Sequence, residues 1–128
     1  MLLSLNEQSS EPLHGQISRQ IRARILASRL AAGQGLPSIR ELARDQRISV
    51  ITVQRAYSDL EREGLIHARP GKGFFISPLS KPEKERLALE RLKEALAPVV
   101  QDALAQGLSA DQVRNMIEGS LKTTGAPK

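Results

Sequence analysis

The chain has 128 residues, which suffice for one compact domain or for one small domain with an appendage. Apolar residues make up 40% and aromatic residues only 2%, so a core must be small and built from Leu, Ile, Val and Ala. The absence of cysteine excludes disulfides, thiolate metal sites and cysteine nucleophiles.

Positive charge is concentrated in the first part of the chain. The net charge is +5; residues 1–78 carry 11 Lys/Arg against 7 Asp/Glu, and residues 79–128 carry 8 against 7. This excess suits a polyanion partner such as DNA. No apolar run approaches the roughly 20 residues that span a bilayer, and residues 1–7 turn acidic too soon for a signal peptide. We therefore expect a cytoplasmic protein without a membrane partner.

The first predicted element is an amphipathic helix. Ile17, Ile21 and Ile25 recur every four residues, which predicts about five turns that begin near Pro12 and end at residues 33–35. The arginines of this segment lie mostly off the apolar stripe: Arg19, Arg22, Arg24 and Arg29.

Two short helices follow with the spacing of a helix-turn-helix. Ser38 and Glu41 form a predicted capping box that opens a helix ending near residues 46–47. Ser49 is placed to cap the next helix, which Gly64 ends. In that helix the inner stripe is Val53, Ala56 and Leu60, and the early outer surface is Ile51, Thr52, Gln54 and Arg55.

Residues 65–68 and 73–76 are β-prone runs around a basic, glycine-containing tip. After three helices, such a hairpin is predicted to be a wing. Its glycines let the backbone approach closely, so that Arg69 and Lys72 can lie beside phosphates. We thus expect a mostly α fold with a small β-hairpin, with residues 1–78 forming a winged helix-turn-helix DNA-binding domain.

Residues 79–128 are predicted to form a two-helix dimerisation segment. An apolar seam in steps of three and four runs from Leu89 to Ala103, and Pro98 should kink this helix or end it early. A second capping box at residues 109–112 opens a last helix, whose apolar residues Val113, Met116, Ile117 and Leu121 should face inward. Residues 125–128 are expected to fray.

Two amphipathic helices cannot bury their apolar stripes alone, so they need a partner surface. A second copy of the chain is the economical partner, although the seam could instead pack on its own winged domain. The residues expected at a homodimer interface are Leu89, Leu92, Leu96, Val99, Val113 and Ile117. No cofactor is predicted. So short a segment is not expected to contain a cavity of ligand size, and no small-molecule effector is identified.

Several segments together resemble the GntR family of transcription factors. They are PLHGQI at 12–17, LPSIRELA at 36–43, TVQRAY at 52–57, LEREGLI at 60–66 and RPGKG at 69–73. The short two-helix tail looks like the YtrA-like branch of that family. The resemblance implies a dimeric repressor that binds an inverted-repeat operator, and members of this branch often lie beside genes for ATP-binding-cassette transporters.

The resemblance also implies DNA contacts on Arg40, on the start of the third helix and on the wing tip. This chain departs from the family at Val50 and Ile51, where relatives commonly have Arg, Pro or Asn; Ile51 could pack on a thymine methyl, and Gln54 could bind adenine. The full set of candidate DNA-binding residues is Ser38, Arg40, Ser49, Ile51, Thr52, Gln54, Arg55, Arg69, Gly71, Lys72 and Gly73.

Alternative roles remain for several residues. Tyr57 is predicted to be a core residue rather than a DNA contact, and Thr52 could serve a helix cap instead of a phosphate. His14 and His67 lack acidic neighbours at ligand spacing, so both are interpreted as surface or packing residues. The sequence contains no nucleophile–base pair and no phosphate-binding loop, so we expect no enzyme. A winged helix that binds another protein is the competing function.

Overall fold

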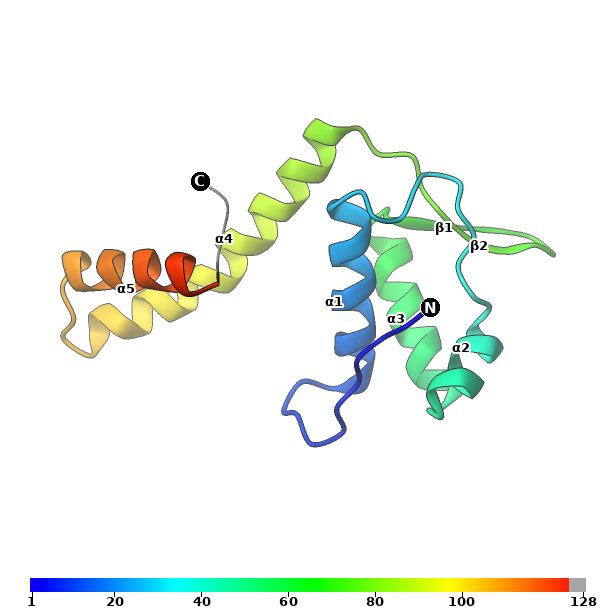
Figure 1. Ribbon diagram of the computed structural model, residues 1–128, viewed down its shortest axis with the longest axis horizontal. Coiled ribbons are helices and arrows are strands. Elements are labelled where there is room, and N and C mark those ends of the chain that lie inside the picture. The colour runs from blue at the N-terminus through cyan, green and yellow to red at the C-terminus, as the bar shows by residue number, and fades with distance from the viewer. Residues whose placement is uncertain (125–128) are drawn as a thin grey trace. The chain divides into compact units, whose positions relative to one another are not determined.

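The computed structural model describes residues 1–124, which fall into two compact units, one spanning Met1–Glu85 and one beginning at Arg86. Five helices and one hairpin follow one another (Figure 1): α1 Leu13–Leu26, α2 Ile39–Gln46, α3 Val50–Arg62, β1 Ile66–Arg69, β2 Gly73–Ile76, α4 Lys81–Ala105 and α5 Ala110–Thr123. The predicted fold class, mostly helical with a small β-hairpin, is confirmed. Within residues 1–124, no helix has the length and apolar character needed to cross a bilayer.

The first helix is shorter than predicted. α1 has 14 residues and ends at Leu26, about one turn earlier than the expected five turns. Ser28 adopts a left-handed conformation with φ 62°. The amides of Arg29 and Leu30 then donate to the carbonyl oxygen of Arg24 at 2.7 and 3.2 Å. This turn closes the helix before residues 33–35, so the expectation of a helix reaching those residues is wrong.

The predicted caps of α2 and α3 are confirmed. The Ser38 hydroxyl accepts a hydrogen bond from the Glu41 amide at 3.1 Å, and the Glu41 carboxylate accepts one from the Ser38 amide at 3.2 Å. The backbone N–H of Ser38, and secondly its hydroxyl, hold the pKa of the Glu41 carboxyl below its ordinary value. The Ser49 hydroxyl accepts from the Thr52 amide at 3.1 Å. Both helices of the predicted helix-turn-helix therefore start where the sequence places them.

The core of the first unit lies between α1 and α3 and extends to α2 and the hairpin. The predicted apolar stripes of α1 and α3 are buried. Burial of each Ile, Val or Leu side chain stabilises the fold by about 1.5–3 kcal/mol. The buried apolar residues are Ile17, Ile21, Ile25, Leu42, Ala43, Val53, Ala56, Tyr57, Leu60, Leu65, Ile66 and Ile76.

The wing is bonded to the segment that precedes α2. β1 and β2 pair antiparallel, with Ile66 opposite Ile76 and Arg69 opposite Gly73. Gly35 forms an additional antiparallel bridge with Phe75. The amides of Gly33 and Leu36 donate to β2 carbonyl oxygens at 2.8 and 2.9 Å. A third backbone segment thus covers the edge of β2 and fixes the base of the hairpin.

The second unit consists of α4 from Arg86 onward and the whole of α5. α4 continues past Pro98 to Ala105, so of the two expected outcomes an early end at Pro98 is wrong. Proline removes one donor, for the carbonyl of Glu94, and the hydrogen bonds of the neighbouring turns carry the helix on. α5 starts at the predicted capping box of Ser109 and Gln112. The predicted fraying of residues 125–128 lies outside the described residues.

Candidate nucleic-acid interface

The outer face of α3 carries a row of exposed side chains. Ile51, Gln54 and Arg55 are exposed, and Gln54 and Arg55 follow Ile51 by three and four residues, so both neighbour Ile51 on the outer side of the helix. The opposite face is buried in the core through Val53 and Leu60. The outer side of α3 therefore exposes both apolar and polar side chains to solvent, and packing against the core fixes its other side.

The first turn of α3 is held by two serine and threonine hydroxyls. The Oγ of Ser49 lies 2.7 Å from the Oγ1 of Thr52, in addition to its bond from the Thr52 amide. Thr52 is half-buried, and Ser49 is exposed. The Thr52 hydroxyl thus takes part in the cap of α3, which is the alternative to a phosphate contact.

Several cations of the first unit have no acidic partner. Ion pairs within this unit involve Arg19, Arg22, Arg44 and Arg62. Among the described residues, no acidic side chain pairs with Arg40 and Arg47, which belong to α2 and its C-cap, with Arg55 on α3, or with Lys72 in the wing. All four residues are exposed. Unpaired, hydrated cations of this kind are available to phosphates.

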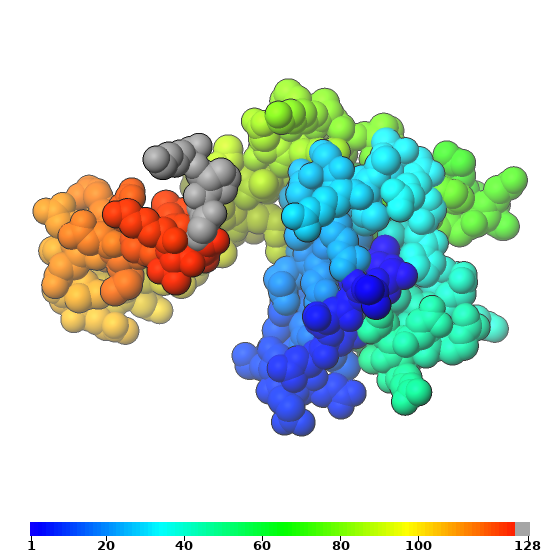
Figure 2. All heavy atoms as spheres, viewed as in Figure 1, coloured from blue at the N-terminus to red at the C-terminus, as the bar shows by residue number. Residues whose placement is uncertain are grey.

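The wing tip is a tight turn built on glycines. Gly71 and Gly73 have φ of 73° and 107°, a region that side chains with a Cβ rarely adopt, and the Lys72 amide donates to the Arg69 carbonyl oxygen at 2.9 Å. The Arg69 guanidinium lies 4.5 Å from the centre of the Phe75 ring. Figure 2 shows the hairpin projecting from the body of the first unit. Lys72 is thus exposed at the end of a short arm, and Arg69 lies along its side.

Tyr57 connects three parts of the candidate interface. Its hydroxyl donates to the carbonyl oxygen of Pro37 at 2.7 Å, and its ring meets Phe74 edge-on, with ring centres 5.2 Å apart. Burial raises the pKa of the phenol. Tyr57 is 0% exposed, which confirms its prediction as a core residue. It joins α3 to the approach of α2 and to the wing.

Two arrangements were not anticipated from the sequence. Arg22, placed off the apolar stripe, is buried and makes a bidentate bond to the Glu63 carboxylate at 2.9 Å, which ties α1 to the end of α3. The side chain of Gln16 exchanges hydrogen bonds with the backbone of Asn6, and the side chain of Gln20 does the same with Ser4. The N-terminal segment, dark blue in Figure 2, is thereby attached to α1.

The two histidines are not gathered into a ligand set. The Nδ1 of His67 lies 3.0 Å from the Ser77 hydroxyl, and His14 is half-buried on α1. Within residues 1–124, no three side chains of His, Asp or Glu come together in a way that could hold a metal ion.

The second unit exposes the residues predicted for dimerisation. Leu89, Leu92 and Val99 are 57–65% exposed, and Ile117 is 37% exposed. Leu96 and Val113 are half-buried between α4 and α5. Met116 and Leu121, predicted to face inward, are 72% and 50% exposed in the single chain, although Met116 lines the space between α4 and α5.

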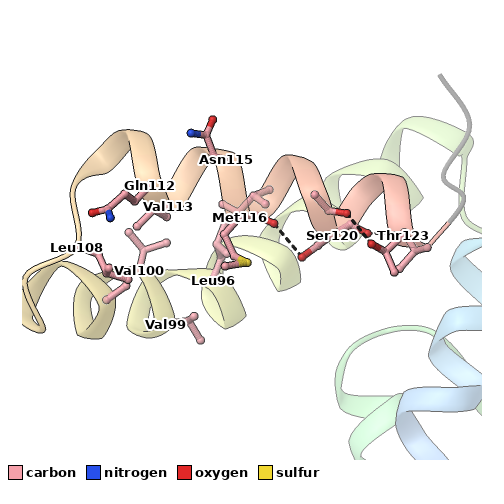
Figure 3. Close-up of a pocket in the computed structure, with 14 residues that line it drawn as sticks. Leu96, Val99, Val100, Leu108, Gln112, Val113, Asn115, Met116, Ser120 and Thr123 are labelled. Carbon is pink, nitrogen blue, oxygen red and sulfur yellow. Dashed lines mark hydrogen bonds between the residues drawn. The ribbon is translucent and has the colours of Figure 1, made fainter.

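An apolar groove runs between α4 and α5. Figure 3 shows Leu96, Val100, Val113 and Met116 pointing into the space between the two helices. The hydroxyls of Ser120 and Thr123 bond back to carbonyl oxygens of α5 at 3.0 and 2.9 Å, so they leave the groove wall apolar. Its volume is about 850 Å³. The expectation that this short segment lacks a cavity of ligand size is therefore wrong, because α4 and α5 leave an apolar groove between them.

Residues 13–76 match the family model described as bacterial regulatory proteins, gntR family. The chain is 36% identical over 112 residues to the uncharacterized HTH-type transcriptional regulator YhcF of Bacillus subtilis, covering 88% of this chain and 89% of that protein. It is 32% identical over 117 residues to the HTH-type transcriptional repressor YtrA of the same organism, covering 91% and 90%.

Two solved structures extend the likeness to three dimensions. A GntR family transcriptional regulator from Listeria monocytogenes superposes with a TM-score of 0.73 at 24% identity, over 90% of this chain and 98% of that chain, which shows a common fold. The DNA-binding domain of AraR in complex with operator ORX1 superposes with a TM-score of 0.53 at 25% identity, over 60% of this chain and 96% of that chain.

Proposed function

Since the chain belongs to the gntR family of bacterial regulatory proteins, and is thus a DNA-binding transcriptional regulator, we propose that it is a homodimeric repressor of an inverted-repeat operator. In this proposal residues 1–78 bind DNA and residues 79–128 hold two copies together. The protein acts in the cytoplasm, has no catalytic activity and needs no cofactor.

The observation that carries the proposal is the row of exposed side chains on α3 beside unpaired cations. Gln54 and Arg55 lie on the face of α3 opposite the core, so this face is free to enter a major groove. Arg40 on α2 and Lys72 on the wing supply charge without an acidic partner among the described residues. Helix, preceding helix and wing are the three parts with which a winged helix-turn-helix binds a duplex.

Each candidate residue has a role that its position allows. Gln54 reads adenine through its amide, and Arg55 contacts the backbone of the duplex. Arg40 binds a phosphate or a guanine, and Lys72 with Arg69 binds phosphates beside the groove. The remaining contacts come from the helix starts and from the backbone of the wing tip: Ser38, Ser49, Ile51, Thr52, Gly71 and Gly73.

The apolar surface of the second unit supports a second copy of the chain as its partner. Leu89, Leu92 and Val99 on α4 and Met116 on α5 are exposed apolar side chains that two helices cannot cover themselves. Two copies would bury these side chains together with Leu96, Val113 and Ile117, which line the groove. A twofold pair then places two α3 helices at half-sites about 34 Å apart, one helical turn of DNA.

Repression is the expected direction of regulation. A dimer bound over a promoter excludes polymerase by occupying its site. The relative YtrA, which matches nine-tenths of both chains, is named as a repressor.

Selection of binding sites from a random duplex library, at about 100 mM salt, tests operator recognition directly. We expect an inverted repeat to be enriched. Arg40→Ala should weaken binding to every sequence, whereas Gln54→Ala should relax selection at one position of each half-site. Arg114→Ala is the matched control, because it removes one positive charge from α5, and it should bind as the wild type does.

If no sequence is enriched and the protein is not retained on DNA at low salt, operator binding is refuted. A function as a protein-binding adaptor would then be favoured.

Light scattering of the purified protein tests the dimer. Leu92→Lys and Met116→Lys place charges on side chains that are already exposed in the single chain, so each unit should stay folded while the dimer dissociates. Lys93→Ala, on an exposed position of the same helix, should leave the dimer intact. A monomeric wild type would contradict the proposed assembly.

A further inference from the structure

The first turn of α3 exposes two apolar side chains side by side. Val50 is 45% exposed and Ile51 is 71% exposed. Within residues 1–85, all of which the structure describes, the other exposed large apolar side chains are those of Met1 and Leu2 at the terminus. Away from the terminal Met1 and Leu2, the large apolar side chains of the first unit are buried or half-buried, except at this helix start, which belongs to the candidate interface.

The surroundings of this apolar pair are cationic. Ile51 shares the outer face of α3 with Gln54 and Arg55, and the exposed Arg40 and Arg47 belong to the neighbouring α2 and its C-cap. An occupant of this surface must be polyanionic and must also offer an apolar group. The major groove of DNA meets both requirements, and the apolar group that it offers is the C5-methyl of thymine.

We propose that Ile51, with Val50 beside it, is a specificity-determining residue that selects a thymine in each half-site through its C5-methyl group. This inference rests on the proposed function, because it requires α3 to lie in the major groove. The side chains of Val50 and Ile51 cannot donate or accept a hydrogen bond, so they would recognise this thymine by apolar contact alone.

The cap of α3 holds the apolar pair in a fixed orientation. Val50 and Ile51 lie between Ser49 and Thr52, whose hydroxyls are 2.7 Å apart and whose backbone and side chain are also bonded. β-branched side chains in a helix keep one strongly preferred rotamer. The cap and this χ1 preference thus restrict the directions in which the two side chains point before any DNA is bound.

The spacing on α3 fixes where the thymine should lie. Ile51 and Gln54 are three residues apart, or about 4.5 Å along the helix axis. Base pairs stack about 3.4 Å apart. The selected thymine should therefore lie one or two base pairs from the adenine that Gln54 reads.

Deoxyuridine substitution in the selected operator tests this inference with the full-length protein. Deoxyuridine lacks the C5-methyl group and keeps the hydrogen-bonding edge of thymine, so each replacement removes one methyl group and nothing else. We expect one thymine per half-site at which wild-type affinity falls about four-fold, the factor for losing the burial of one methyl group. Measured by fluorescence anisotropy, the same replacement should have no effect on Ile51→Ala.

The control variant is Ser58→Ala, which lies on the same exposed face of α3 two turns further on. It should retain the sensitivity to deoxyuridine. Unchanged wild-type affinity at every replaced thymine would overturn the inference while leaving operator binding intact, and so would a sensitivity that persists in Ile51→Ala. If the library yields no operator at all, both this inference and the proposed function fail.

Discussion

The ion pair between the buried Arg22 and the half-buried Glu63 is a contact whose removal should clearly destabilise the first unit. The guanidinium joins the middle of α1 to the end of α3, with two nitrogen–oxygen distances of 2.9 Å. The side chains are 9% and 26% exposed, respectively. Arg22→Met keeps most of the length of the side chain and removes its charge, so it tests the ion pair with little loss of packing.

Arg22→Met and Glu63→Met should lower the free energy of unfolding by different amounts. Removing one partner of a buried pair costs about 3–5 kcal/mol, because the other charge stays desolvated. After Arg22→Met the more exposed Glu63 can recover part of its hydration, so we expect a loss of about 3 kcal/mol. After Glu63→Met the guanidinium, which is 9% exposed, is stranded, and the loss should be about 4 kcal/mol. The double variant leaves no stranded charge and should lie within about 1 kcal/mol of the wild type.

Urea unfolding at one fixed protein concentration, followed by circular dichroism, measures these free energies. The matched control is Arg19→Met, which breaks the exposed pair with Glu11, whose side chains are 59% and 36% exposed. It should cost less than about 1 kcal/mol. The reasoning is refuted if both single variants at the buried pair lose no more than this control, or if the double variant loses the sum of the two.

Four other predictions concern the wing, the core, the long helix and acid stability. Lys72→Ala should weaken binding to all sequences alike and reduce the slope of log affinity against log salt by about 1, measured by anisotropy across a salt series; an unchanged slope would remove Lys72 from the phosphate contacts. Tyr57→Phe should lower the free energy of unfolding by about 1 kcal/mol, because it deletes the bond to Pro37, and a urea titration that finds no loss would contradict a role for this bond. Pro98→Ala restores a backbone donor inside α4 and should stabilise the second unit by about 1–3 kcal/mol in thermal unfolding; destabilisation would mean that proline is required there. The folded-state pKa of Glu41 is depressed, so its carboxylate stabilises the fold above the unfolded-state pKa, and this contribution is lost as the pH falls through the folded-state value. The stability of Glu41→Gln, measured by acid titration, should lack this part of the pH dependence. A profile identical to that of the wild type would contradict a stabilising role of the Glu41 carboxylate.

Local patterns were the features that the sequence predicted well. The caps at Ser38, Ser49 and Ser109 depend on residues three apart, and each of them is present. The stripes around Val53 and Leu60 follow from helical periodicity and are buried. Such features need no knowledge of the rest of the fold, because their partners lie within one or two turns.

Features that join distant segments could not be predicted in this way. Arg22 bonds to a residue 41 positions away, and the bridge between Gly35 and Phe75 joins residues that no periodicity connects. The early end of α1 depends on a left-handed residue at Ser28, a conformation that serine seldom adopts. Met116 lines the groove between α4 and α5 yet is 72% exposed in the single chain, because helical periodicity predicts an apolar stripe without identifying the surface that covers it.

The position of Tyr57 also bears on the entropy of binding. One buried side chain contacts Pro37, ahead of α2, and Phe74, in the wing, so the parts that would meet DNA are ordered relative to one another when the protein folds. A partner that binds a preorganised surface does not have to offset the loss of that conformational freedom. The glycine-flanked tip around Lys72 and exposed long side chains such as those of Arg40, Gln54 and Arg55 would still lose freedom on binding. Affinity gained in this way adds no contact to the complex, and it would disappear in a variant that loosens Tyr57 even though every DNA-contacting residue is retained.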